Sequence, residues 1–370
     1  MDWFYPGFKG GGPIRSCFNL VTMLQHDFDV KVITRDTDFG ESAPYPEIVS
    51  DKWSRTASGI QVLYLSKQHL SYATIRQLLI EEQADHVYLN SMYSKHFSIY
   101  PLLACRFNKL PALITLAPRG MLYQSAVNRK IVKKKIFLFL LTATGLHKSI
   151  RFHATNNRER DSIHTYFGQV QVFIANNLPA QEQPPLAVCE KRKGALRCIF
   201  ISRIDPIKNL LLLLEILKEV EADVSLDIIG PIENENYWQQ CMAVIDSWPA
   251  NVQAKLHGAV KNELIDNYIR QSHLFVLLSE GENFGHAIFE TFLAGRPVLI
   301  SNQTPWLELE IKKIGWDLDI SNRDAIRAVL EQAATWDQET FQTWSTAAWT
   351  YAHDYLANKK YKEAYYRIFA

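Results

Sequence analysis

The sequence predicts an α/β protein built from two doubly wound parallel sheets, and two observations support this fold class. Short runs rich in β-branched or aromatic residues alternate with longer segments of helical periodicity. This alternation occurs as two series, which are separated by a polar stretch that contains three prolines. Strands that alternate with helices build parallel sheets, so each series predicts one Rossmann-like domain.

The first series contains six expected strands, and helices are expected in most of the gaps between them. These strands are 29–35, 60–66, 86–90, 112–117, 152–155 and 171–175. The second series contains five, namely 197–202, 224–229, 254–259, 274–278 and 297–300. Because ligands of open α/β sheets bind beyond the carboxyl ends of the strands, two facing domains would share one site in an interdomain cleft.

The domain boundary is expected in the polar stretch 176–185 (NNLPAQEQPP), where prolines prevent both a helix and a central strand. We therefore predict a first Rossmann-like domain over 1–178 and a second over 179–349, with a helix at about 350–370 that packs back on the first. A chain of 370 residues that is 47% apolar is long enough for two cores. Residues 1–4 are either a stub of the first strand or the end of a truncated start.

Composition excludes several classes of protein. The formal charge is only +1 and the charged residues are interspersed, which argues against nucleic acid as a partner. Five cysteines without a C-x-x-C pair argue against a disulfide framework or a zinc site and fit a reducing cytoplasm. No secretory signal and no apolar run of roughly 20 residues is found, so we expect a cytoplasmic protein, soluble or peripheral to a membrane.

The segment 282–290 (ENFGHAIFE) is typical of a tight turn that leads into a helix apolar almost all round. Its last residue, Glu290, stands among apolar neighbours, so the helix is expected to be buried and the carboxylate to need a partner. A polar ligand would be such a partner. Glu282 either caps the helix or faces a ligand together with the free N–H groups of its first turn.

Two cations follow the first strand of the second domain. Arg203 and Lys208 lie between the strand 197–202 and a leucine-rich helix. The planar fork of an arginine and the compact charge of a lysine at the end of a strand suit a diphosphate. The alternative is a solvated loop in which Arg203 pairs with Asp205.

Two loop motifs of the first domain allow two interpretations each. The triplet Gly10–Gly12, flanked by Lys9 and Arg15, is either a cradle for a phosphate or sugar or an ordinary flexible turn. The D-x-D triplet 36–38 is of the kind that holds a divalent ion on nucleotide sugars, but it has no partner cluster. We expect it, like the similar triplet 317–319, to be a solvated loop and predict no metal site.

The segment 129–141 joins the basic stretch RKIVKKK to the apolar stretch IFLFLL, and it is too short to cross a bilayer. Its residues from Lys130 to Leu141 either lie on a membrane surface, with the lysines near anionic lipid, or form a core helix with a solvated basic edge. The first alternative would place the protein at the inner face of the cytoplasmic membrane.

Together these residues resemble a retaining glycosyltransferase of family four with a GT-B fold. The resemblance rests on R-x4-K from Arg203 to Lys208 and E-x7-E from Glu282 to Glu290. The surrounding stretches make it specific, and these are 280–286 (EGENFGH), 294–298 (AGRPV), 304–306 (TPW) and 315–317 (GWD). It spans nearly the whole chain, is strongest over 197–320, and is similar to enzymes that build bacterial surface polysaccharides.

The resemblance implies that the first domain lies on the acceptor side and that the second binds the nucleotide sugar, and it implies a role for each motif. Arg203 and Lys208 would neutralise the leaving diphosphate, while Glu282 would bond hydroxyls of the donor sugar and Glu290 would hold the ribose. The other donor contacts would come from Gly11, Gly12, Asn283, Phe284 and Gly285. Where many relatives place a histidine near the donor sugar, this chain has Arg119, which is expected to bind there instead.

The implied reaction moves a sugar from a nucleoside-diphosphate sugar to a hydroxyl of a glycan or lipid-linked acceptor, with no cofactor and no metal. Fixed cations stabilise the charge that develops on the departing phosphate. An acceptor that enters from the same face would retain the anomeric configuration. Two other functions stay open, which are a sugar-nucleotide epimerase of the same architecture and an inactive carbohydrate-binding relative.

Overall fold

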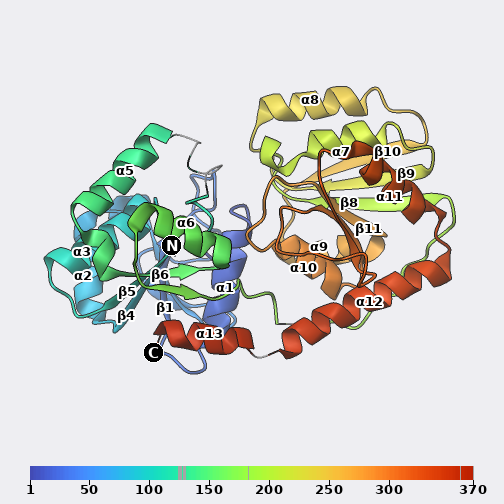
Figure 1. Cartoon of the computed structure of the whole chain (residues 1–370). Coiled ribbons are helices and arrows are strands. Elements are labelled where there is room, and N and C mark those ends of the chain that lie inside the picture. The colour runs from blue at the N-terminus through green and yellow to red at the C-terminus, as the bar shows by residue number, and fades with distance from the viewer. Residues whose placement is uncertain (124–126, 128–130, 182, 359, 370) are drawn as a thin grey trace. The chain divides into compact units, whose positions relative to one another are not determined.

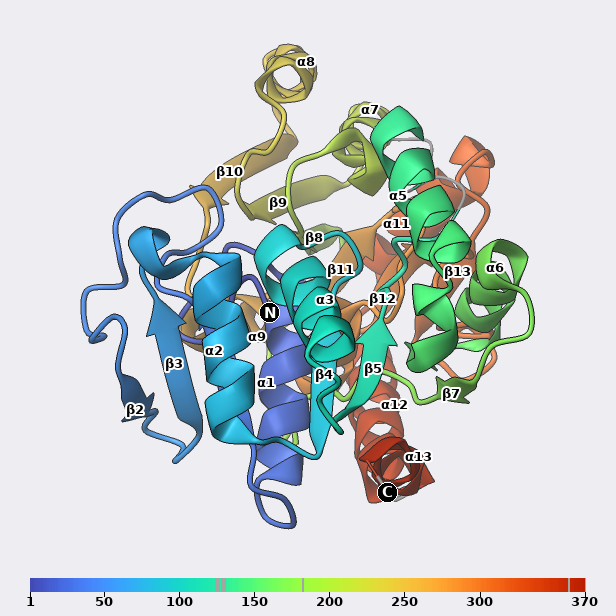
Figure 2. The same cartoon turned by 90° about the vertical axis from the view of Figure 1, so that its left-hand side faces the viewer.

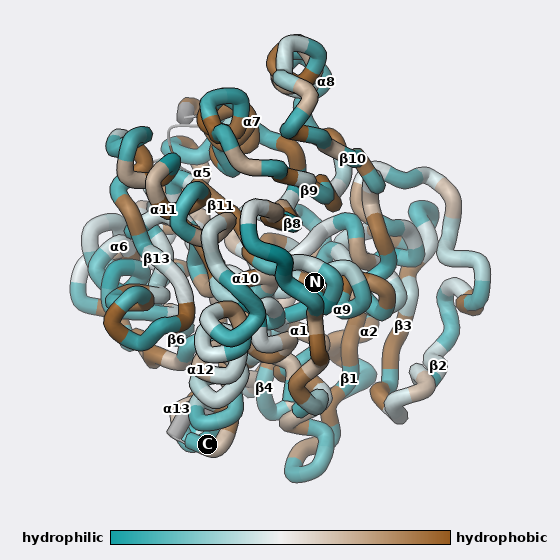
Figure 3. The backbone as a smooth tube through the Cα atoms, turned by 90° about the vertical axis from the view of Figure 1, so that its right-hand side faces the viewer, coloured by the Kyte–Doolittle hydropathy of each residue, from teal (hydrophilic) through white to brown (hydrophobic). Residues whose placement is uncertain are grey.

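The computed structural model describes residues 1–123, 127, 131–181, 183–358 and 360–369. Its chain divides into two compact units (Figure 1). Unit 1 consists of Met1–Leu178 with Lys359–Ala370, and unit 2 consists of Pro179–Asn358. In both units the strands are mostly hydrophobic and most connecting loops are hydrophilic (Figure 3), as expected for sheets that are covered on both faces.

The strands of unit 1 form two sheets. The first has the order β1-β3-β2, in which β1 (Lys31–Arg35) runs parallel to β3 (Gln61–Leu65) and β2 (Trp53–Arg55) runs antiparallel to β3. The second is parallel in the order of its strands along the chain, which are β4 (His86–Asn90), β5 (Leu113–Ala117), β6 (Ile150–Ala154) and β7 (Val172–Ile174). Among the described residues, no strand is assigned to 1–4, although the amino group of Met1 donates to the carbonyl oxygen of Ile33 at 2.9 Å.

The described helices of unit 1 are α1 (Gly12–Leu24), α2 (Tyr72–Glu82), α3 (Tyr100–Phe107), α5 (Ile131–Ala143), α6 (Asn157–Phe167) and α13 (Lys360–Phe369). Short helical turns lie at η1 (Lys67–His69), η2 (Lys95–Ile99) and η3 (Leu146–Ser149). Figure 2 shows α2 and α3 side by side in front of the strands. Side chains of Ser71 and Asn156 accept N–H groups at the starts of α2 and α6, which fixes where these helices begin.

Unit 2 contains one parallel sheet of six strands in the order β10-β9-β8-β11-β12-β13. In chain order the strands are β8 (Ala195–Ile201), β9 (Asp223–Ile229), β10 (Val252–Gly258), β11 (Leu274–Leu277), β12 (Val298–Ser301) and β13 (Gly315–Leu318). The direction of winding therefore reverses between β8 and β11. In doubly wound sheets this switch point is where ligands bind.

The helices of unit 2 are α7 (Leu210–Leu217), α8 (Glu235–Ile245), α9 (Asn262–Gln271), α10 (His286–Leu293), α11 (Arg323–Thr335) and α12 (Gln338–Ala357). The predicted helix at about 350–370 is two helices, because α12 ends at Ala357 and packs in unit 2, whereas α13 packs in unit 1. In α13, Tyr365 and Ile368 are buried against Leu20 and Leu178. None of the described helices is long and apolar enough to cross a membrane.

Candidate active site

The candidate site of unit 2 lies at the switch point of its sheet. Strands β8 and β11 are direct neighbours, with Cys198 opposite Leu274. Arg203 and Lys208 follow the carboxyl end of β8, and Glu282 follows the carboxyl end of β11. Parallel strands end at one edge of a sheet, so both loops emerge at that edge.

The loop after β8 is held in a fixed shape by local hydrogen bonds. Its single helical turn η4 (Pro206–Lys208) is capped by Asp205, whose carboxylate accepts the N–H of Ile207 at 3.1 Å. The turn ends at Asn209, which has a left-handed backbone (φ 52°) and donates its side-chain N–H to Leu278 O at 2.9 Å. These bonds position Lys208 beside the neighbouring strand end.

The loop after β11 is bonded to this turn. The N–H of Glu280 donates to Ile207 O at 2.9 Å, and the hydroxyl of Ser279 donates to the same oxygen at 3.2 Å. Lys208 Nζ then lies 2.6 Å from Glu282 Oε1. The two side chains are only 12% and 14% exposed, which strengthens their electrostatic interaction relative to a surface pair.

Arg203 is paired across to the loop that follows β9. Its Nη1 lies 2.5 Å from Glu233 Oε1, while Asp205, the partner in the alternative interpretation, caps η4. Gly230 makes this approach possible, because a Cβ there would lie 1.9 Å from Ser202 O. The adjoining residues Ile204 and Ile232 form an isolated parallel bridge.

Helix α10 places Glu290 on its less buried side. Glu290 and His286, four residues apart, are both half-buried, whereas Ile288, Phe289 and Phe292 are buried. The carboxylate that was expected to be buried is therefore only half-buried, because apolar packing covers one side of α10 more fully than the other. Gly285 (φ 77°) occupies the N-cap position without a side-chain cap, so Glu282 does not cap α10.

The turn before α10 is fixed by aromatic packing. Phe284 is buried, its ring centroid lies 5.2 Å from that of Trp306, and its carbonyl oxygen accepts the indole N–H of Trp306. Asn283 before it is half-buried. This packing leaves the backbone of residues 283–285 at the same sheet edge as Lys208.

In unit 1, Arg119 follows the carboxyl end of β5 and is half-buried. Its Nε donates to Asn90 Oδ1 at 2.7 Å, its Nη2 donates to the Tyr88 hydroxyl at 2.9 Å, and its Nη1 donates to Asn177. All three guanidinium nitrogens thus have acceptors inside unit 1. The predicted donor contact of Arg119 stays a prediction, and the structure gives this side chain a bracing role between three segments.

The glycine loop of unit 1 precedes α1, with Gly11 at the N-cap (φ 66°) and Gly12 exposed as the first helical residue. Asp38 holds this loop, because its carboxylate accepts the N–H of Phe8 at 2.9 Å and that of Lys9 at 3.2 Å. The D-x-D triplet is therefore not a solvated loop, since Asp36 and Asp38 are buried. The sequence did not indicate that a carboxylate about 30 residues on would anchor the loop.

The other acidic triplet is also structural in part. Asp317 accepts the N–H groups of Leu309 at 2.9 Å and Glu308 at 3.2 Å, and Asp319 accepts the N–H of Ser321 at 2.8 Å. Among the described residues, no three or more His, Cys, Asp or Glu side chains are grouped so that they could hold a metal ion.

Two α/β units and a polar site at the switch point of a parallel sheet are typical of enzymes that bind nucleotides. Comparisons with known proteins narrow this class. Residues 186–348 match the family model described as Glycosyl transferases group 1. No curated protein matches the chain.

Solved structures are similar over nearly the whole chain. HepE from Anabaena, in complex with UDP and glucose, is 14% identical with a TM-score of 0.67, and the match covers 95% of this chain and 94% of that one. WaaG, a glycosyltransferase involved in lipopolysaccharide biosynthesis, is 14% identical with a TM-score of 0.64 and the same coverage. A trehalose-6-phosphate synthase, described as transferring glycosyl groups with retention, is 10% identical with a TM-score of 0.66, over 95% of this chain and 94% of that one.

At these identities the structures establish the fold. The protein has the GT-B fold, and residues 186–348 of its second unit match the group 1 glycosyltransferase family model. The GT-B fold that the resemblance implied is thereby confirmed, and the family match over residues 186–348 agrees with the R-x4-K and E-x7-E motifs.

Proposed function

We propose that the protein is a retaining glycosyltransferase that uses a nucleoside-diphosphate sugar as donor. The observation that carries this proposal is the grouping of Arg203, Lys208 and Glu282 at the switch point of unit 2. Two cations at one strand end suit the two phosphates of a diphosphate, and the neighbouring carboxylate suits sugar hydroxyls. UDP and glucose in the HepE structure support the same class of donor.

In this proposal the ion pairs describe the site before the donor binds. The diphosphate would take over Arg203 and Lys208 from Glu233 and Glu282, and the released Glu282 carboxylate would accept hydroxyl groups of the sugar. Glu290, on the less buried side of α10, would hold the ribose. The N–H groups at the start of α10 would add positive potential to the bound phosphates.

The same groups provide what front-face transfer needs. As the bond between the anomeric carbon and the phosphate oxygen breaks, the electron pair stays with the diphosphate, where Arg203 and Lys208 stabilise the new charge. The acceptor hydroxyl bonds the anomeric carbon from the same face and passes its proton to the departing phosphate oxygen. Fixed cations supply the charge stabilisation that a divalent ion supplies in other enzymes, so we propose a metal-independent reaction.

We place this reaction in surface-polysaccharide synthesis, with a glycan or lipid-linked acceptor, at the inner face of the cytoplasmic membrane. The similarity to WaaG, which acts in lipopolysaccharide biosynthesis, supports this setting. The chain would reach the membrane as a peripheral protein.

The proposal is tested with Lys208→Ala and a matched control, Lys218→Ala. Lys218 ends α7 in the same unit and bonds the hydroxyl of Ser247 on the surface. We expect Lys208→Ala to lower kcat/KM for transfer about 100-fold or more and to weaken UDP binding by calorimetry, while Lys218→Ala leaves both unchanged. Near-normal turnover by folded Lys208→Ala would contradict the proposed role.

Product analysis separates transfer from epimerisation. A panel of nucleotide sugars is first ranked by thermal shift, since a ligand that binds only the native state raises its apparent stability. The best donor is then incubated with and without glycan acceptors. A transferase releases the nucleoside diphosphate and extends the acceptor, whereas an altered sugar on an intact nucleotide would identify an epimerase.

A further inference from the structure

Helix α5 of unit 1 exposes large apolar side chains on one side while its other side is part of the core. Leu138 and Leu141 are buried in the unit's core. In contrast, Val132 and Phe139 are 67% and 69% exposed, and Ile136 and Leu140 are each 54% exposed. Figures 1 and 2 show α5 at the periphery of unit 1. A contiguous exposed apolar face of this kind marks an interaction surface.

The spacing of these residues makes the exposed face a narrow stripe. Successive residues of an α-helix are about 100° apart, so the four exposed apolar side chains fall within an arc of about 100°. Lys135 flanks this arc on one side and Lys133 on the other, and both lysines are exposed. Lysines beside an apolar stripe can keep their ammonium groups in water while the stripe is buried against a partner, because their side chains are long and flexible. The core-helix alternative therefore describes only half of α5.

The sequence around α5 is strongly basic. Residues 86–158 contain twelve Lys or Arg and no Asp or Glu, whereas the remainder of the chain contains 28 basic and 39 acidic residues. The prediction that charges are interspersed throughout is therefore wrong for this segment. The net charge of the whole chain is close to zero because the positive charge of residues 86–158 is offset by the negative charge of the remaining sequence. Arg129 and Lys130, which the predicted membrane segment includes, lie outside the described residues.

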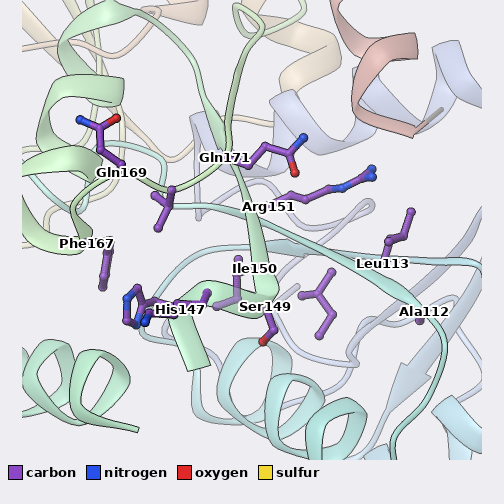
Figure 4. Close-up of a pocket in the computed structure, with 12 residues that line it drawn as sticks. Ala112, Leu113, His147, Ser149, Ile150, Arg151, Phe167, Gln169 and Gln171 are labelled. Carbon is purple, nitrogen blue, oxygen red and sulfur yellow. The ribbon is translucent and has the colours of Figure 1, made fainter. Parts of the chain in front are cut away.

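A cavity of about 550 Å³ begins four residues after α5 and has the same charge pattern (Figure 4). It lies at the amino ends of β5, β6 and β7, and its lining includes His147, Lys148 and Arg151 but no carboxylate. In Figure 4 His147 and Phe167 lie at one end of this lining, and Arg151 and Leu113 at the other. Lys148 and Arg151 thus add two cations close in sequence to the basic helix.

We propose that the outer face of α5 docks on an anionic lipid bilayer. The apolar stripe would enter the boundary between headgroups and acyl chains, and Lys133, Lys135 and Lys148 would contact the phosphate groups. A nucleic acid would use the positive charge but not the apolar stripe. This docking surface rests on the membrane location proposed above. It is tested by vesicle binding alone, so a negative result would leave the proposed transferase activity untouched.

The apolar part is tested with Ile136→Ser/Phe139→Ser and the control Ile311→Ser. Ile311 is 84% exposed and lies in unit 2, so the control removes an exposed isoleucine elsewhere. Binding to phosphatidylglycerol vesicles is measured by co-sedimentation. We expect the double variant to bind at least tenfold more weakly and the control to bind like the wild type.

The electrostatic part is tested with Lys133→Gln/Lys135→Gln against Lys52→Gln/Lys67→Gln. All four lysines are exposed in unit 1, but only the first pair flanks the stripe. At about 1 kcal/mol per lysine near an anionic surface, we expect a loss of about 30-fold for the first pair. Binding should weaken with added salt and be weak to phosphatidylcholine vesicles.

Three measurements together decide the proposal. UDP binding by each variant, measured in parallel, shows that unit 2 is intact. Equal vesicle binding by wild type and both α5 variants would overturn the proposal. Concentration-dependent self-association that is lost in Ile136→Ser/Phe139→Ser, without vesicle binding, would also overturn it and identify a second copy of the chain as the occupant.

Discussion

Arginines follow strand ends in both units, but they are held in different ways. Arg119 in unit 1 donates from all three guanidinium nitrogens to neutral oxygen atoms of Asn90, Asn177 and Tyr88. Arg203 in unit 2 pairs with a carboxylate, Glu233, and is 41% exposed. A carboxylate can be exchanged for a phosphate of similar charge and geometry. The comparison indicates that an anionic ligand can replace Glu233 as the partner of Arg203 without disturbing the fold. The bonds of Arg119, in contrast, stabilise the fold of unit 1.

The partners of Arg119 extend this difference into the core. The Tyr88 hydroxyl lies 2.6 Å from Nδ1 of His153, and Nε2 of His153 lies 2.8 Å from Ala175 O. His153 is fully buried, and burial lowers its pKa to about 3, so the ring is neutral. Its Nε2 then donates to the carbonyl and its Nδ1 accepts from Tyr88. Arg119 thus begins a chain of bonds that joins β4, β6 and the segment after β7.

The largest expected effect comes from removing that brace with Arg119→Met. It leaves three buried or half-buried oxygens without their charged donor, so we expect the free energy of unfolding to fall by about 3 to 5 kcal/mol. Urea unfolding checks this value. UDP binding, measured on Arg119→Met once its urea curve shows that it is folded without denaturant, should be unchanged.

Arg106→Met is the matched control, because Arg106 is an exposed arginine on α3 of the same unit. It should change stability by less than about 0.5 kcal/mol. If Arg119→Met left stability intact but weakened binding of the intact nucleotide sugar, Arg119 would be a donor ligand, as the resemblance implies, and the contrast between the two strand ends would fail.

A smaller effect is expected from acid, and it compares one histidine of each unit. Burial lowers the pKa of both His153 and His273 to about 3, and His273 is likewise held between the N–H of Arg197 and the carbonyl of Glu190. In the unfolded chain each ring has a pKa near 6.5, so the unfolded state binds protons first as the pH falls. Stability should therefore be lost from about pH 6.5 down to about pH 3.

For each histidine the loss is about 1.4 kcal/mol per pH unit in this window, or about 2 kcal/mol at pH 5. Urea unfolding at pH 7 and pH 5 measures the sum for the two rings. NMR of the imidazole protons separates them, because neither ring should titrate between pH 8 and pH 5. A titration midpoint near pH 6.5 for either ring would show that burial does not lower the pKa of that histidine.

Much of the fold was predictable, because alternation and apolar runs report burial directly. Each of the eleven expected strands overlaps an observed one. The missed strands are β2, which has three residues and pairs antiparallel at an edge, and β13, whose four residues include Asp317. Neither has the continuous apolar run of a central strand. The division of the terminal helix at Asn358 was also missed, since a helical pattern does not reveal which unit a helix packs on.

The site was predictable in its residues but not in its partners. Spacing identified Arg203, Lys208 and Glu282, but their contacts depend on loops that fold together from distant parts of the chain. Glu233 lies 30 positions from Arg203. The local sequence indicates this contact only through Gly230, the glycine directly after β9, which lets the two loops approach each other. Asp38 was misread for the same reason, because a solvated acid and an acid that binds loop N–H groups have the same local sequence.

The smallest effect is expected from Glu233→Gln, and it tests the exchangeable ion pair most directly. Among the described residues Glu233 is the carboxylate that pairs with Arg203, so without it we expect UDP to bind about two- to fivefold more tightly, consistent with a partly exposed pair worth about 1 kcal/mol or less. Glu235→Gln is the control, since Glu235 is an exposed acid two residues further on that bonds Gln239. Calorimetry at low and high salt measures both variants, and the gain should shrink as salt screens the pair. Weaker UDP binding by Glu233→Gln alone would show that Glu233 orients Arg203 for the phosphate rather than competing with it, and the two strand ends would then be alike.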